Sequence, residues 1–71
     1  MPKYVCVYTA TPISVPLGTV LVGTPVEDGR FVLTQDSDLL DIVDKPRWEK
    51  GWDMPLVGNY WEWEEVKNYV L

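Results

Sequence analysis

Short runs of β-branched and aromatic residues, separated by glycine and proline, make up most of this chain. Residues 4–9, 19–22 and 30–34 are three such runs, and this composition is typical of β-strands. Asp28-Gly29 lies between the second and third runs and is a strong signal for a tight turn. We therefore expect residues 19–22, which end at Gly23, and residues 30–34 to pair as an antiparallel hairpin.

The connection between the first two runs is rich in proline. Pro12 and Pro16 bracket residues 13–15, and proline cannot donate a hydrogen bond to a neighbouring strand. We expect a loop or an irregular edge strand at these three positions.

In residues 38–44, single aspartates are separated by pairs of apolar residues. This spacing fits the helical period better than the strand period. Asp36 or Ser37 would cap the beginning of such a helix, and Lys45-Pro46 would end it. The pattern predicts one short helix near residues 37–44, with a strand as the alternative.

The C-terminal third combines a loop with a final strand. Residues 46–58 contain two prolines and two glycines, which predict a loop anchored by aromatic side chains. Residues 59–66 are expected to form a strand whose side chains alternate between two faces. One face would carry Trp61, Trp63 and Glu65, and the other would carry Tyr60, Glu62, Glu64 and Val66.

The order of these elements resembles a known group of small barrels. A strand beginning Leu17-Gly18-Thr19, the Asp28-Gly29 turn and a strand beginning Arg30-Phe31 follow one another closely after a proline-rich loop. Residues 15–34 are similar in this respect to the small SH3-like barrels of short bacterial and phage proteins. The resemblance implies a five-stranded barrel with a binding role, and it carries over no catalytic residue. The expected fold is therefore mainly β: a small, SH3-like, partly open barrel or antiparallel sheet with one short helix.

Length and charge restrict the functions open to this chain. Seventy-one residues predict a single domain over residues 1–71. The net charge is −5 and the six basic residues form no stripe, which disfavours direct nucleic-acid binding and favours a basic partner protein. No segment is apolar enough for a membrane span or a signal peptide, and the lone Cys6 fits a reducing compartment. We expect a cytoplasmic protein without membrane contact.

Groups that support catalysis or metal binding are scarce. The chain has no histidine, so the usual general base is missing, and no basic neighbour in the sequence would activate Cys6. We expect so short a chain to have little room for a ligand pocket of about 300 Å³ or more. The aspartates between residues 36 and 44 lack the glycine and closing glutamate of a calcium loop. The sequence therefore predicts no enzyme activity, no cofactor and no metal site.

Four tryptophans in the C-terminal third are the clearest functional signal. Tryptophan is enriched at binding hot spots, and a domain of this size cannot easily bury four indole rings. Trp61 and Trp63 would fill the core or form a contact patch. Trp48 and Trp52 would anchor the loop or face a partner. Trp52 is the stronger candidate for exposure, because no apolar periodicity surrounds it.

Acidic residues are interleaved with these tryptophans. The predicted partner-binding surface consists of Trp52, Trp61, Trp63, Asp53, Glu62 and Glu64. A secondary acidic surface would consist of Asp36, Asp38, Asp41 and Asp44. Such carboxylates form an ordinary solvated face or, alternatively, mimic nucleic-acid phosphates toward a basic groove on another protein.

Together these features predict a non-catalytic, acidic protein–protein interaction domain. In size and style the chain resembles the short phage proteins that bind and inhibit host enzymes. In that case the partner would be a nucleic-acid-processing or defence enzyme with a basic surface, in the cytoplasm of a bacterial host. One alternative is a self-associating assembly or virion component, such as a homodimer formed through exposed strand edges. Another alternative is an SH3-like peptide-binding module with an aromatic groove.

Overall fold

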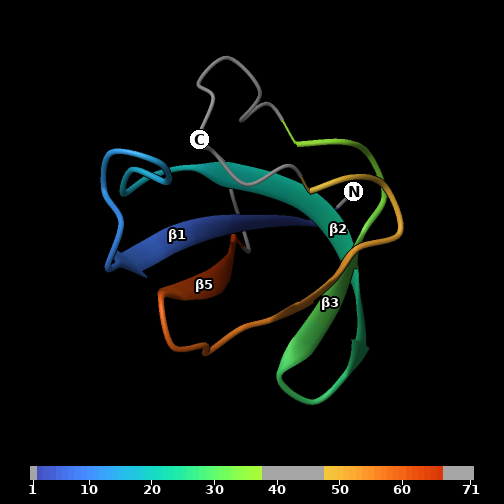
Figure 1. Cartoon of the computed structure of the whole chain (residues 1–71). Coiled ribbons are helices and arrows are strands. Elements are labelled where there is room, and N and C mark those ends of the chain that lie inside the picture. Colours follow the sequence, from blue (N-terminus) through green and yellow to red (C-terminus); the bar gives the residue numbers. More distant parts are fainter. Residues whose placement is uncertain (1, 38–47, 67–71) are drawn as a thin grey trace, which may run out of the picture.

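Five β-strands form one antiparallel sheet in the described part of this protein. The computed structural model describes residues 2–37 and 48–66, and within these ranges the strand order across the sheet is β4-β3-β2-β1-β5 (Figure 1). The strands are β1 (Lys3–Thr9), β2 (Val20–Glu27), β3 (Arg30–Leu33), β4 (Asp53–Pro55) and β5 (Trp61–Val66). All four pairings between neighbouring strands are antiparallel, so the expected mainly β architecture is confirmed.

β2 is longer than the sequence predicts, and it joins the two halves of the sheet. Residues 20–22 pair with β1, whereas Gly23 and the residues after it pair with β3. Figure 1 shows the strand curving between these two partners. A Cβ atom on Gly23 would lie 2.6 Å from the carbonyl oxygen of Val32, so a glycine is needed for this close approach of β3. The prediction that the strand ends at Gly23 is wrong, because the strand continues through this glycine.

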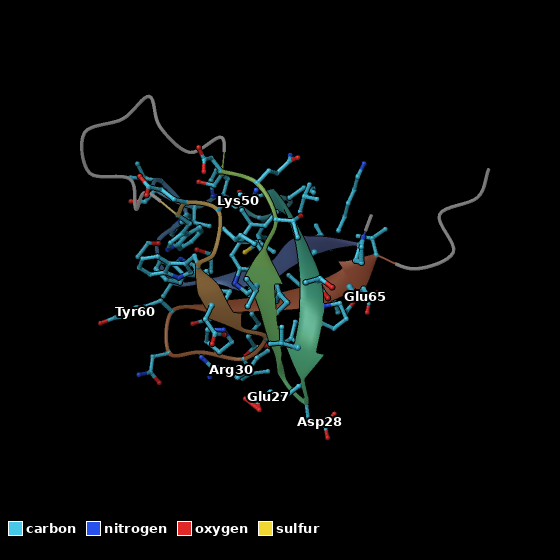
Figure 2. The ribbon with its side chains drawn as sticks, turned by 90° about the vertical axis from the view of Figure 1, so that its right-hand side faces the viewer. Glu27, Asp28, Arg30, Lys50, Tyr60 and Glu65 are labelled. Carbon is cyan, nitrogen blue, oxygen red and sulfur yellow. The ribbon has the colours of Figure 1, made fainter. Side chains whose placement is uncertain are left out.

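The predicted hairpin between β2 and β3 is confirmed. The two strands pair antiparallel, with a register shift between Pro25 and Glu27. Gly29 lies in the turn with φ of 80°, a conformation that L side chains rarely adopt. Figure 2 shows Glu27 and Asp28 at the tip of this hairpin. Both residues are exposed.

The first and last strands of the sequence lie side by side. β1 and β5 pair antiparallel, with a register shift between Cys6 and Tyr8. At this irregularity the Cys6 thiol donates a hydrogen bond to the Tyr8 carbonyl at 3.2 Å. The predicted final strand is confirmed, although it begins at Trp61 rather than at residue 59.

One strand lies where the sequence predicts a loop. β4 falls within residues 46–58 and pairs with β3 through Phe31 and Met54. Before it, Gly51 reverses the chain with φ of 95°, and its N–H donates to the Leu33 carbonyl at 2.9 Å. The difference between the predicted loop and the observed strand has a simple cause. A strand of three residues leaves no periodic pattern, and it forms because β3 presents a free edge.

The segment after β4 brings the two edges of the sheet toward each other. The Leu56 carbonyl accepts a hydrogen bond from the Trp63 N–H at 2.7 Å, and the Gly58 N–H donates to the Trp61 carbonyl at 3.0 Å. The chain that leaves the β4 edge is thus bonded to β5, which forms the opposite edge.

The helix expected near residues 37–44 lies outside the described residues, except for Ser37. Ser37 is buried, and its N–H donates to the Trp48 carbonyl at 2.8 Å. Within residues 2–37 and 48–66, no helix is long and apolar enough to cross a membrane.

Aromatic rings in contact form the centre of the core. Phe31 is 0% exposed and stacks on Tyr4, with ring centroids 3.8 Å apart and an interplanar angle of 10°. The rings of Trp63 and Phe31 pack in a T-shaped arrangement with centroids 6.4 Å apart, and those of Trp48 and Trp63 do the same with centroids 5.8 Å apart. Such pairs contribute to stability beyond the area that they bury. The buried apolar residues are Tyr4, Cys6, Val15, Leu21, Phe31, Leu33, Trp48, Met54 and Trp63.

Tyr4 allows a test of this core. The side chain is 1% exposed, yet its hydroxyl has no hydrogen-bond partner among the described residues. Burial, and to a smaller extent the negative charge of Glu65, raises the pKa of Tyr4. We expect Tyr4→Phe to leave the free energy of unfolding at pH 7 unchanged or to raise it by up to about 2 kcal/mol, because it removes a buried hydroxyl that has no partner among the described residues.

The same substitution should reduce the loss of stability in alkaline solution. A raised folded-state pKa contributes stability that is complete below the unfolded-state pKa of about 10 and is lost as pH rises through the folded-state pKa. Urea unfolding between pH 7 and pH 11 measures the difference, with Tyr8→Phe as the exposed control. A marked drop in stability at pH 7, or an unchanged alkaline loss, would contradict this account of Tyr4.

Candidate functional site: an aromatic groove

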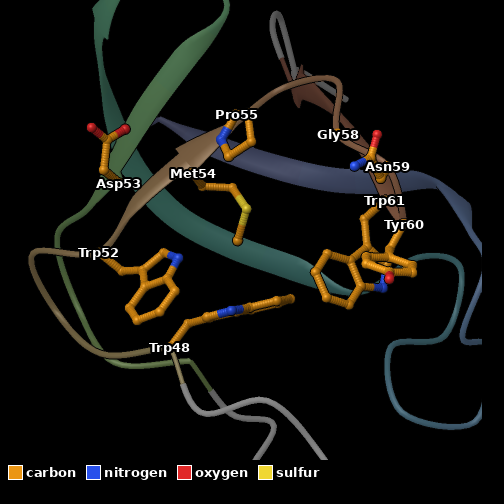
Figure 3. A pocket seen from close by; sticks show the side chains of 9 residues that line it. All are labelled: Trp48, Trp52, Asp53, Met54, Pro55, Gly58, Asn59, Tyr60 and Trp61. Carbon is orange, nitrogen blue, oxygen red and sulfur yellow. The ribbon is translucent and has the colours of Figure 1, made fainter.

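A hollow lined by aromatic side chains lies between β4 and the beginning of β5 (Figure 3). Its volume is about 300 Å³, which is at the lower end of the range for ligand sites. The expectation that so short a chain has little room for such a pocket is therefore wrong. We call this hollow the aromatic groove, and its lining consists of Trp48, Trp52, Asp53, Met54, Pro55, Gly58, Asn59, Tyr60 and Trp61.

The groove has a buried floor and an exposed rim. Trp48 and Met54 are each 3% exposed and belong to the core. At the rim, Trp52 is 47% exposed and Tyr60 is 56% exposed. Figure 3 shows Trp48 and Trp52 on one side of the groove and Tyr60 and Trp61 on the other. The rings at the rim are thus supported by the core beneath them and remain open to solvent.

Trp61 is held in place by contacts on several sides. Its indole N–H donates a hydrogen bond to the Thr11 hydroxyl at 2.9 Å. Its ring packs against the ring of Trp48 in a T-shaped arrangement with centroids 5.1 Å apart, and its centroid lies 5.6 Å from that of the Tyr60 ring. Tyr60 is fixed in turn, since its carbonyl accepts a hydrogen bond from the Ala10 N–H at 2.7 Å. The loop after β1 therefore sets the position of this side of the groove.

The backbone of Trp52 is also fixed, although its ring is exposed. Its N–H donates to the Glu49 carbonyl at 2.9 Å, and its carbonyl accepts from the Leu33 N–H at 2.9 Å. These bonds anchor the residue at the turn before β4. An exposed ring on a fixed backbone loses less entropy on binding than one on a free loop. The expectation that Trp52 faces outward agrees with its exposed fraction.

Asp53 is the charged residue in the lining of the groove. Its Oδ1 accepts a hydrogen bond from Nε of Arg30 on β3 at 3.0 Å, and both side chains are substantially exposed. An exposed ion pair of this kind contributes little to stability, typically about 0–1 kcal/mol. The nearest described cation thus already occupies one oxygen of this carboxylate.

The structure brings together half of the predicted partner-binding residues and separates the rest. Trp52, Asp53 and Trp61 line the groove. Trp63 is 3% exposed and belongs to the core, which is the first of the two positions considered for it from the sequence. The reason is the alternation of β5, which turns this ring toward Phe31. The two predicted glutamates, Glu62 and Glu64, are outside the lining: Glu62 is half-buried and Glu64 is exposed.

The predicted secondary acidic surface is described at one position only. Asp36 is exposed, and its Oδ1 accepts a hydrogen bond from the backbone N–H of Lys50 at 2.8 Å. This carboxylate therefore holds the turn that leads to Trp52. Asp38, Asp41 and Asp44 lie outside the described residues.

Sequence reasoning did not select Tyr60, Pro55 and Asn59 as candidate residues. The strand pattern assigned Tyr60 to the face opposite the tryptophans, but β5 begins one residue later. Tyr60 thus lies in the preceding bend, where alternation does not apply. The Gly58-Asn59 pair before it is a turn signal that could have identified this position.

Few titratable groups line the groove. Asp53 and Tyr60 are the titratable residues among the lining residues, and Asp53 already forms an ion pair. Cys6 lies in the core, where burial raises the pKa of its thiol and so disfavours the reactive thiolate. Within the described ranges, no group of three or more acidic, cysteine or histidine residues could hold a metal ion.

Comparisons of this chain with protein-family models, with curated proteins and with solved structures gave no match.

Proposed function

We propose that this chain is a non-catalytic binding domain that receives an extended segment of a partner protein in the aromatic groove. One observation carries the proposal: Trp52 and Tyr60 stand 47% and 56% exposed above a floor of buried side chains. Aromatic side chains beside a packed, buried pocket are typical of binding hot spots. A partner that covered these rings would remove their apolar surface from water.

The dimensions of the groove favour an extended segment as the occupant. A volume of about 300 Å³ holds one or two side chains and is too small for a whole helix. Extended and polyproline-type peptides commonly bind in aromatic-lined grooves.

We also propose that the sheet is an SH3-like barrel. The strand order and the hydrogen bond between Leu56 and Trp63 support this proposal.

Charge favours a basic partner. The chain carries a net charge of −5, and its acidic residues include the neighbours of two groove tryptophans, Glu49 and Glu62. A negative surface accelerates association with a positive one and suppresses binding to acidic proteins. The partner surface around the groove is therefore expected to be basic.

Two functions that the sequence left open stay predictions. Inhibition of a host enzyme by a phage protein would use the same groove on a larger partner. Self-association as an assembly component would instead require the groove, or a strand edge, to meet a second copy. The groove favours peptide binding over these two because its volume matches a few side chains.

A peptide selection tests the proposed function. Wild-type protein is used to select binders from a library of random twelve-residue peptides, and the affinities of the recovered peptides are then measured for variants. We expect Trp52→Ala and Tyr60→Ala to weaken binding about tenfold or more, as is typical for hot-spot residues.

Val57→Ala is the matched control. Val57 is 72% exposed and lies outside the groove lining, so its loss should leave the affinities unchanged. Failure to recover peptides from the library, or equal binding by wild type and Trp52→Ala, would overturn the proposed function. A purely dimeric state in sedimentation, with the groove protected, would favour self-association instead.

A further inference from the structure

We propose that the aromatic groove recognises the guanidinium group of an arginine side chain on the partner. This inference rests on the proposed function, because it names the chemical group that enters the same groove. Three properties of the site support it: the aromatic side chains at its rim, the absence of a lysine or arginine from its lining among the described residues, and its open shape.

The first property is the aromatic lining. Trp48, Trp52, Tyr60 and Trp61 come from two separate stretches of the chain and surround one small hollow. The face of each ring carries partial negative charge, so a cation that lies over it is attracted. Tryptophan is the most effective of the aromatic residues in this role, and three of the four rings are indoles. A neutral aliphatic side chain would gain burial here but none of this attraction.

The second property is the distribution of charge. Among the described residues, no lysine or arginine lines the groove, and its one charged lining residue is the carboxylate of Asp53. Arg30 bonds that carboxylate through a single oxygen, Oδ1. Arg30 partly offsets the charge of Asp53, so the net charge of −5 supplies the wider attraction for an incoming cation. The ring faces, rather than Asp53, are expected to supply most of the specific contact.

The third property distinguishes arginine from lysine. A guanidinium group is planar and weakly hydrated, so it can stack on an indole face while its in-plane N–H groups still reach water. The half-exposed rings of Trp52 and Tyr60 leave the groove open enough for this arrangement. A lysine ammonium is a compact, strongly hydrated charge, which loses more water when it meets an aromatic wall. The groove therefore suits arginine better than lysine.

Small probes test the inference without knowledge of the partner. The indole N–H signals of ¹⁵N-labelled protein are followed by NMR during titration with N-acetyl-arginine-N-methylamide. The citrulline analogue has nearly the same shape but no charge, and the lysine analogue has charge without the planar group. We expect the arginine probe to move the signals of Trp52 and Trp61 saturably and to leave that of Trp63 nearly unchanged. The citrulline probe should bind about tenfold more weakly, and the lysine probe should fall between the two.

Two substitutions at one position separate ring chemistry from apolar area. Trp52→Leu keeps an apolar side chain without a π face, and Trp52→Phe keeps a smaller π face. We expect Trp52→Leu to lower the affinity for the arginine probe several-fold more than Trp52→Phe does, and Val57→Ala to leave it unchanged. The dispersion of the amide signals confirms that each variant is folded.

The outcomes distinguish this inference from the function on which it rests. Equal responses to arginine and citrulline, no saturable response, or equal effects of Trp52→Leu and Trp52→Phe would overturn the arginine site. If library peptides still required Trp52 in that case, the binding function would stand. If the arginine probe bound as expected but no peptide was recovered, the arginine site would stand and the peptide-binding function would fall.

Discussion

Replacement of Phe31 by alanine is expected to lower the free energy of unfolding by about 3–5 kcal/mol. Phe31 is 0% exposed, stacks on Tyr4 and packs against Trp63, so its loss leaves a cavity at the centre of the core. A folded chain of 71 residues typically has a total stability of only about 4–11 kcal/mol. The loss is therefore a large fraction of the total stability, and the urea midpoint of the variant should fall steeply.

Urea unfolding followed by tryptophan fluorescence measures this effect, because Trp63 packs against Phe31 and Trp48 packs against Trp63. Ile13→Ala is the matched control, since Ile13 is 82% exposed and its loss should change stability by no more than about 0.5 kcal/mol. A loss below about 1 kcal/mol in Phe31→Ala would show that this ring does not occupy the centre of the core. The groove should disappear with the core, because Trp48 and Met54 belong to both.

Replacement of Gly23 by alanine is expected to cost about 3 kcal/mol. The added Cβ would lie 2.6 Å from the Val32 carbonyl oxygen and 2.9 Å from Cδ2 of Phe31. The first neighbour is backbone within β3, so it cannot move aside without disturbing the pairing of β2 with β3. The substitution would push apart the two strands at the point where β2 passes from one partner to the other.

Gly58→Ala provides the control for this glycine. A Cβ at Gly58 would find its nearest neighbour at 3.5 Å, which is ordinary van der Waals contact, and its backbone is not in the left-handed region. Thermal unfolding of both variants measures the difference, and Gly58→Ala should remain close to wild type. Similar melting temperatures for Gly23→Ala and wild type would mean that β2 and β3 are farther apart than described here.

Local sequence patterns were sufficient for β1, β3, β5 and the hairpin between β2 and β3. Residues 4–9 and 30–34 carry β-branched and aromatic side chains whose preferences match a pleated, half-buried surface, and both became strands. The Asp28-Gly29 turn was recognisable because a positive φ at this position requires a residue such as glycine. These features depend on neighbours in the sequence, so no knowledge of the sheet was needed.

Long-range features were not accessible in the same way. β4 is a three-residue strand that exists because β3 has an open edge, and nothing in residues 53–55 announces it. The continuation of β2 past Gly23 depends on a close approach by Val32, which lies on another strand. Both differences from expectation arise where pairing with a distant segment outweighs the low local preference of glycine and proline for strands.

The sequence by itself determined that this protein is built from antiparallel strands, that it is acidic, and that its aromatic residues concentrate in the C-terminal third. Only the tertiary structure decided which of those rings are buried. Trp63 turned inward toward Phe31, whereas Trp52 and Tyr60 remained at the rim of a groove assembled from separate segments. The physical reason is that burial depends on which distant residues pack against a ring. Composition and spacing report only how many rings there are and how they alternate along one strand.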